Sequence, residues 1–229
     1  LRYLHESAND YLTGPYLEEE FMEDLMRVTE GQTNETLARF TIRQSNNVGE
    51  WMGKHGCMFQ PSMRGTLHLS RTNAFFLGGG KALMNGYYAT ADKLGVKIVY
   101  AAEVREMEIC DGTFHSALFV SKEVSHRVRA KSVVVASGGF QANLEWLKTY
   151  WGDAADNFIV RGSPYDKGLL LRLLLDNGVK PVGDERQCHA VAIDARAPKY
   201  DGGIVTRLDC VSFGIVVNRH ARRFYDEGE

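Results

Sequence analysis

The sequence predicts an α/β fold, and three features lead to that prediction. A triple glycine at 78–80 is followed by a helical pattern whose apolar face covers 82–91 and ends at Leu94-Gly95. A short apolar run, "VKIVY", then precedes three strand-like segments. Finally, "KSVVVASGGF" places an uninterrupted apolar run directly before two glycines, as expected for a strand covered on both faces. Helix, strand, β-meander and returning strand together favour a nucleotide-binding α/β domain.

The first sixty residues predict helices. In "YLEEEFMEDLMRVTEG", apolar residues recur at helical spacing from Leu17 to Val28, and Gly31 supplies a stop signal. "NETLARFTIRQ" and "SNNVGEWMGKHG" predict two more helices, the second ending near Gly56. We assign this region to packing and give it no chemistry.

The predicted meander comes next. "REMEIC" and "TFHSALFVS" flank Asp111-Gly112, and Asp-Gly between two strand-like runs is a strong hairpin signal. "HRVRA" predicts the third strand of this group.

Composition narrows the class of protein. The 229 residues are 44% hydrophobic and 24% charged, which suits a globular core. A formal charge of -2 gives no electrostatic footprint for nucleic acid, and no apolar run approaches the roughly 20 residues that span a bilayer. The four cysteines are scattered without a C-x-x-C, which favours free thiols in a reducing compartment over a disulfide framework or a zinc site.

The two glycine-rich turns, 78–80 and 138–139, need a physical reason. Glycine lets a ligand approach the backbone closely, and a helix N-terminus presents free N–H groups to a phosphate. Both turns are therefore candidates to line one phosphate-bearing cofactor. The alternative is a flexible loop and a tight exit turn, and the glycine pattern by itself leaves both open.

Three segments, "RTNAFFLGGGKALMN", "VVVASGGFQAN" and "GIVVNRHARRF", resemble the FAD-dependent fumarate reductase and succinate dehydrogenase-like flavoproteins. Within that group the likeness is strongest to the tricarballylate dehydrogenase branch. The resemblance implies an incomplete FAD/NAD(P)-binding Rossmann-like domain with an inserted β-meander, followed by the start of an α+β substrate-capping domain. The implied division is 1–185, helical over 1–60 and α/β over 61–185, and then 186–229.

The resemblance also implies that the chain is an excised fragment. The family's G-x-G-x-x-G motif is missing, and the chain opens "LRYLHESAND" without a Met. An arginine that shuttles the substrate proton in the family is expected beyond Glu229.

Carried over by position, the resemblance implies FAD contacts. They fall on Ser70, Arg71, Thr72, Gly78, Gly79, Gly80, Val104, Ser137, Gly138 and Gly139. Two have ordinary structural alternatives, a surface ion pair for Arg71 and core packing for Val104. One departure stands out, because Leu169 occupies the position of an Asp that contacts the cofactor in the family. Either that contact is lost, or Asp166 supplies it from an altered loop.

The resemblance also assigns substrate binding to three residues, His189, Thr206 and Arg207. His189 matches a histidine that binds a substrate carboxylate, and imidazole can donate to a carboxylate. Arg207 stands where the family has a proton-relay Glu, and its guanidinium is shaped to clamp an additional carboxylate. A structural histidine and a solvated surface arginine are the alternatives.

The implied activity is dehydrogenation of a small polycarboxylate, tricarballylate to cis-aconitate, with FAD taking the hydride. Fumarate-type reduction, a flavin monooxygenase of corrin biosynthesis, and a non-catalytic ligand-binding fragment are the alternatives. An iron–sulfur protein of the membrane is a candidate electron acceptor. The expected location is cytoplasmic, with peripheral attachment to the inner face of the membrane as a variant.

Overall fold

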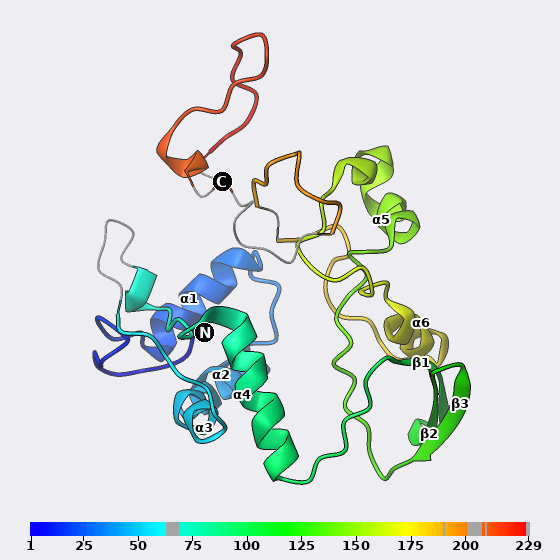
Figure 1. The fold of residues 1–229 in the computed structure, drawn as a ribbon. Coiled ribbons are helices and arrows are strands. Elements are labelled where there is room, and N and C mark those ends of the chain that lie inside the picture. The colour runs from blue at the N-terminus through cyan, green and yellow to red at the C-terminus, as the bar shows by residue number, and fades with distance from the viewer. Residues whose placement is uncertain (63–68, 190, 201–207, 209, 228–229) are drawn as a thin grey trace. The chain divides into compact units, whose positions relative to one another are not determined.

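In the computed structural model, the chain folds as two compact units, Leu1–Ile98 and Val99–Glu229 (Figure 1). The structure describes residues 1–62, 69–189, 191–200, 208 and 210–227. We refer to the two parts as unit 1 and unit 2.

Unit 1 is helical, as predicted. It contains α1 (Glu18–Val28), α2 (Glu35–Ser45), α3 (Val48–Lys54), the short 3-10 turn η1 (Leu69–Arg71) and α4 (Gly79–Lys93). The side chain of Asn34 caps α2 by accepting from the Leu37 nitrogen at 3.0 Å. Glu18 of α1 joins the first two helices through ion pairs with Arg39 and Arg43 of α2.

The core of unit 1 forms where the N-terminal segment meets the segment before α4. Tyr3, Leu12 and Ala74 are buried together there. At the other side of the unit, α4 packs closely on the end of α3, and a Cβ added to Gly86 would lie 3.0 Å from the carbonyl carbon of Gly56. Glycine at 86 therefore allows a close helix approach that any side chain would prevent.

Unit 2 contains the predicted meander. Strands β1 (Ala102–Cys110), β2 (Thr113–Ser121) and β3 (Val124–Arg129) form an antiparallel sheet in the order β1-β2-β3. Asp111 and Gly112 both have positive φ, 50° and 73°, which is the conformation that a two-residue hairpin requires. The hairpin prediction is confirmed.

The rest of unit 2 contains shorter helices. These are α5 (Leu144–Trp151), the 3-10 helix η2 (Gly152–Asn157), α6 (Leu169–Asp176) and the 3-10 turn η3 (Val211–Phe213). The helix α6 lies beside β1 (Figure 1).

Two predicted strands are not formed in this structure. Neither "VKIVY" at 96–100 nor the apolar run at 133–136 pairs with a strand, and Val134 is 90% exposed. A strand of this type is stabilised by neighbours on both sides and by layers on both faces. Among the described residues the sheet consists of β1, β2 and β3, so these runs have no strand beside them. The Rossmann-like arrangement and the capping domain stay predictions.

Candidate cofactor site

Helix α4 begins at the first glycine turn, and the structural reason for having glycine differs among its three positions. Gly78 and Gly79 have φ of 75° and 68°, a region that other residues rarely adopt. A Cβ on Gly78 would also lie 2.8 Å from the Cβ of Ala82. Gly80 has no positive φ, and a Cβ there would meet nothing within 4 Å. Neither backbone conformation nor packing within the described residues explains glycine at 80.

The start of α4 also differs in charge from the other helices of unit 1. Each of α1, α2 and α3 has glutamate in its first turn, whereas α4 has no acidic residue there and carries Lys81. No side chain caps α4. The positive end of this helix dipole is therefore open to an anionic group.

The predicted contacts at Ser70, Arg71 and Thr72 lie in or next to η1. Ser70 is 1% exposed, and its carbonyl accepts from the Thr13 nitrogen at 3.0 Å. The Arg71 guanidinium donates to the Pro15 carbonyl at 3.3 Å and forms an ion pair with Glu20. The hydrogen bond from Arg71 lowers the pKa of the Glu20 carboxyl. Arg71 thus forms the surface ion pair that was its structural alternative.

His5 was missed by sequence reasoning, and it contacts the same turn. Its Nδ1 lies 2.8 Å from the carbonyl oxygen of Tyr3. Its Nε2 lies 2.8 Å from the carbonyl of Gly14 and 3.1 Å from that of Arg71. The side chain is buried, at 6% exposure. Nothing in "LRYLHESAND" signals this role, because two of its three partners are remote in sequence.

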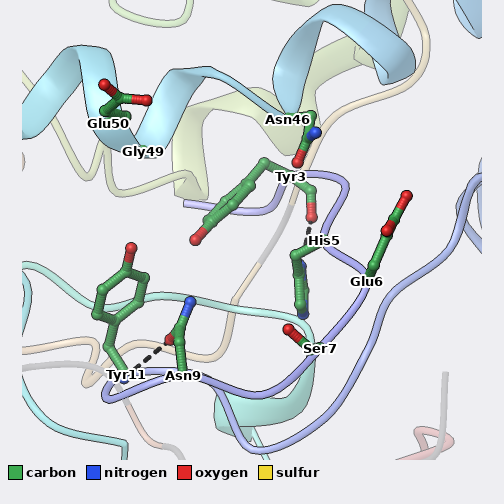
Figure 2. Close-up of a pocket in the computed structure, with 9 residues that line it drawn as sticks. All are labelled: Tyr3, His5, Glu6, Ser7, Asn9, Tyr11, Asn46, Gly49 and Glu50. Atoms are coloured by element: carbon green, nitrogen blue, oxygen red, sulfur yellow. Dashed lines mark hydrogen bonds between the residues drawn. The ribbon is translucent and has the colours of Figure 1, made fainter.

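A pocket of about 320 Å³ is lined in part by His5 (Figure 2). Burial raises the pKa of the Tyr3 phenol, and its hydrogen bond with Tyr11 adds to the shift, so this hydroxyl stays neutral. Among its described lining residues are Glu6 and Glu50 and no lysine or arginine, which does not suit a polycarboxylate. The lining residues are Tyr3, His5, Glu6, Ser7, Asn9, Tyr11, Asn46, Gly49 and Glu50.

The second glycine turn lies in unit 2 and is covered by side chains of the chain itself. Gly138 has φ of 75°, and a Cβ there would lie 3.0 Å from Oδ1 of Asp166. A Cβ on Gly139 would lie 3.0 Å from Oε1 of Gln141. Gln141 donates from Nε2 to Asp166 at 3.0 Å, and the Asp166 carbonyl accepts from the nitrogen of Ala142 at 2.9 Å. The altered loop therefore brings Asp166 to the predicted turn.

Gly168 explains how this loop enters α6. It has φ of 75°, and a Cβ there would lie 2.7 Å from the Cβ of Phe140 and overlap the ring of Trp146. Phe140 and Trp146 stack with ring centroids 4.4 Å apart. Glycine at 168 is thus required both by backbone conformation and by the rings packed against it.

Val104 lies on β1, opposite Phe119 of β2, and the register shifts between Val104 and Glu106. Since β1 is at one edge of the sheet, backbone groups on its outer side face no strand among the described residues. This placement suits a cofactor contact made through the backbone atoms of β1, and the predicted contact at Val104 stays a prediction.

The substrate-side residues are placed only in part. His189 is exposed and lies outside helices and strands. Thr206 and Arg207 lie outside the described residues, so their predicted roles stay predictions. Ser70, Arg71, Thr72 and the first glycine turn belong to unit 1, while Val104, the second turn and His189 belong to unit 2. That the two turns line one ligand also stays a prediction.

The described residues contain no cluster of three or more His, Cys, Asp or Glu side chains that could hold a metal ion. The four cysteines are unpaired in this structure, and Cys57 is the buried one. Within the described part of the chain, no helix has the length and apolar character to cross a bilayer.

Comparison with known proteins identifies the family of this chain. Residues 12–229 match the FAD binding domain family, and the chain belongs to it. FAD is therefore its cofactor, as predicted.

The similarity to individual proteins is more distant than the match to the family. The NADH:fumarate oxidoreductase of Klebsiella pneumoniae (strain 342) is 24% identical over 216 residues, which cover 91% of this chain and 22% of that protein. The chain thus spans about a fifth of the length of this curated relative.

Two solved structures show the fold. The 3-ketosteroid-delta4-(5alpha)-dehydrogenase from Rhodococcus jostii RHA1, in complex with 4-androstene-3,17-dione, superposes with a TM-score of 0.70 at 18% identity. That match covers 99% of this chain and 52% of the other. The open conformation of a flavocytochrome c3 fumarate reductase gives a TM-score of 0.61 at 20% identity, covering 70% of this chain and 29% of the other. The chain therefore has an FAD-binding flavoprotein fold of mixed helix and sheet.

Proposed function

We propose that this chain forms part of the FAD site of an oxidoreductase that dehydrogenates a small polycarboxylate, with tricarballylate to cis-aconitate as the specific reaction. One observation carries the cofactor side of the proposal. Gly79 and Gly80 present bare backbone with open space around it, at an uncapped helix end without acidic residues. The tricarballylate assignment is supported by the resemblance of "LSRTNAFFLGGGKALMN" to the tricarballylate dehydrogenase branch of these flavoproteins.

The residues of the first turn fit a dinucleotide. When bound, FAD supplies the hydride chemistry of such an enzyme. The bare backbone at 79–80 lets a flat or phosphate-bearing group lie against the start of α4, and Lys81 adds positive charge there. On the neighbouring segment Thr72 places a hydroxyl group where this proposal puts the flavin, whereas the Ser70 side chain is buried.

The second turn suits a different part of the cofactor. The Asp166 carboxylate beside Gly138 repels a phosphate but accepts hydrogen bonds from hydroxyl groups. We therefore assign Ser137, Gly138, Gly139 and Asp166 to a hydroxyl-bearing portion of FAD. Asp166 then takes the role of the Asp that Leu169 replaces.

On the substrate side, His189, Thr206 and Arg207 bind carboxylates in this proposal. Arg207 clamps the additional carboxylate of a tricarboxylate through two parallel N–H donors. These groups orient the substrate so that the carbon that loses hydride faces the cofactor. The electron acceptor, proposed as an iron–sulfur protein of the membrane, has no residue assigned to it.

Reduction of a carbon–carbon double bond is the second candidate. It is supported by the similarity to an NADH:fumarate oxidoreductase over 91% of this chain. Fold and cofactor do not set the direction of the reaction.

The cofactor proposal is tested by Gly80→Ala with Gly53→Ala as its matched control. Both glycines have open space at Cβ and lie within helices of unit 1. Either change is expected to stabilise the fold by about 0.5–1 kcal/mol, because alanine is the better helix former. Only Gly80→Ala is expected to weaken FAD binding, about tenfold, in a fluorescence titration. Equal FAD affinity in both variants would contradict the placement.

The substrate proposal is tested by adding tricarballylate to the FAD-loaded full-length protein without oxygen. Loss of the oxidised flavin absorbance indicates dehydrogenation, and a response that requires oxygen indicates the monooxygenase alternative. Arg207→Ala is expected to raise the KM for tricarballylate. An unchanged KM and kcat in that variant would remove Arg207 from the site. FAD binding without any turnover would support the non-catalytic alternative.

A further inference from the structure

The His5 side chain makes an unusual set of contacts for a buried histidine. Both ring nitrogens face backbone carbonyl oxygens, Tyr3 at Nδ1 and both Gly14 and Arg71 at Nε2. A carbonyl oxygen accepts hydrogen bonds and cannot donate them. The two contacts at Nε2 therefore need a ring N–H at that nitrogen, which the carbonyls of Gly14 and Arg71 share.

The contact with Arg71 joins two segments that are far apart in the sequence, and the contact with Gly14 reaches beyond the local turn. Gly14 is nine residues from His5, and Arg71 is 66 residues away. A histidine that only filled space in a local turn would not need to reach either of them.

His5 stands at the centre of a larger junction between 1–16 and 69–74. The nitrogen of Leu1 donates to the Ala74 carbonyl, and the Ala74 nitrogen donates to the Leu1 carbonyl, each at 2.8 Å. The Thr13 nitrogen donates to the Ser70 carbonyl at 3.0 Å. Between these two points, His5 is the side chain that holds the Arg71 carbonyl.

The approach of the two segments is close at the position of His5. A Cβ on Gly14 would lie 3.4 Å from Cγ of Arg71, so the stem of Arg71 passes directly over Gly14. One ring nitrogen can therefore reach both carbonyls at once. Without that N–H, two inward-facing carbonyls lose their shared donor, which is costly at a buried position.

We propose that His5 is a positioning residue for the cofactor: its Nε2–H, shared between the carbonyls of Gly14 and Arg71, fixes the main chain of Ser70, Arg71 and Thr72 against Gly14, in the conformation that receives FAD. This inference rests on the proposed function, which places those three residues beside the flavin. His5 acts through the Arg71 carbonyl and need not touch the cofactor.

The test compares His5→Phe with His55→Phe in the full-length protein. Phenylalanine keeps a ring of similar size and removes both nitrogens. His55 is a matched control because the contact of its Nδ1 with the Trp51 carbonyl, at 2.6 Å, stays within one helical turn, and its ring stacks on Trp51. We expect His5→Phe to weaken FAD binding about tenfold and to speed hydrogen exchange at the Thr13 amide, with no effect of His55→Phe.

Two further variants distinguish a hydrogen-bonding role of His5 from a role in which its ring only fills space. Glutamine places its amide nitrogen near the position of Nε2, whereas asparagine reaches only that of Nδ1. His5→Gln is therefore expected to restore most of the FAD affinity, and His5→Asn is not. Equal affinities in the two amide variants would overturn the proposal.

The remaining outcomes distinguish this inference from the proposed function. If His5→Phe speeds exchange at Thr13 but leaves FAD affinity unchanged, while Gly80→Ala weakens it, the role of His5 is wrong and the cofactor site stands. If neither variant changes FAD affinity, the cofactor placement fails, and this inference fails with it. Unchanged exchange at Thr13 in His5→Phe would show that His5 does not hold the junction.

Discussion

The two glycine-rich turns, which look alike in the sequence, differ in the structure. The turn at 78–80 is open, and a Cβ on Gly79 or Gly80 would meet nothing. The turn at 138–139 is covered by Asp166 and Gln141, which lie 3.0 Å from where Cβ atoms would stand. Glycine in the first turn leaves room for a ligand, whereas glycine in the second also accommodates the chain itself. A glycine motif therefore supports a ligand site most directly where the fold gives no internal reason for it.

The largest expected effect concerns the loop that closes the second turn. Gly168→Ala is expected to destabilise the chain by about 3 kcal/mol, because strain at positive φ adds to overlap with Phe140 and Trp146. Gly178→Ala is the matched control, with φ of 76° but open space at Cβ, and is expected to cost about 1 kcal/mol. Denaturant unfolding measures both. Equal losses of stability in the two variants would mean that Phe140 and Trp146 move aside without cost. Their packing would then not require glycine at 168.

An intermediate effect is expected from Asp166→Ala, which uncovers the second turn. Loss of the hydrogen bond from Gln141 is expected to cost about 1 kcal/mol of stability. If the turn binds a hydroxyl-bearing part of FAD, affinity falls by about fivefold, again about 1 kcal/mol. If it lies beneath a phosphate, affinity rises instead, because a negative charge has been removed. The exposed Asp176→Ala at the end of α6 controls for net charge.

The smallest effect concerns the ion pair beside the first turn. Arg71 lowers the pKa of Glu20 below its ordinary value of 4.5. A lowered carboxyl pKa gives stability that is present above pH 4.5 and is lost as the pH falls through the folded value. Because the pair is on the surface, about 0.5 kcal/mol is at stake. Glu20→Gln is expected to remove this pH dependence in unfolding curves taken below pH 5. An unchanged curve would mean that Arg71 is free to turn toward a cofactor.

The sequence predicted the local elements well because their signals are local. Spacing of apolar residues gave α1 and α4, and Asp111-Gly112 gave the hairpin. The runs at 96–100 and 133–136 carry an equally clear strand pattern, yet they pair with no strand among the described residues. Such strands depend on partners elsewhere in the chain or beyond it, so their residues alone cannot determine the outcome.

For the same reason, some residues of the candidate site could be predicted from the sequence and others could not. The glycine turns and the FAD family followed from contiguous segments, and the family match confirms the cofactor. His5 gave no signal, because its role depends on carbonyls at Gly14 and Arg71 that only folding brings to it. The place of Asp166 beside Gly138 likewise depends on a contact across 28 positions of the chain.

By itself, the sequence determined where the helices and the hairpin form, and that the chain carries an FAD-binding flavoprotein domain. The tertiary structure decided which glycine turn is open, which carboxylate stands over the other, and which histidine holds the segment before α4. The physical reason is that periodicity and turn chemistry act over a few neighbouring residues. A cavity, a covered turn or a shared hydrogen-bond donor exists only once distant segments have packed together.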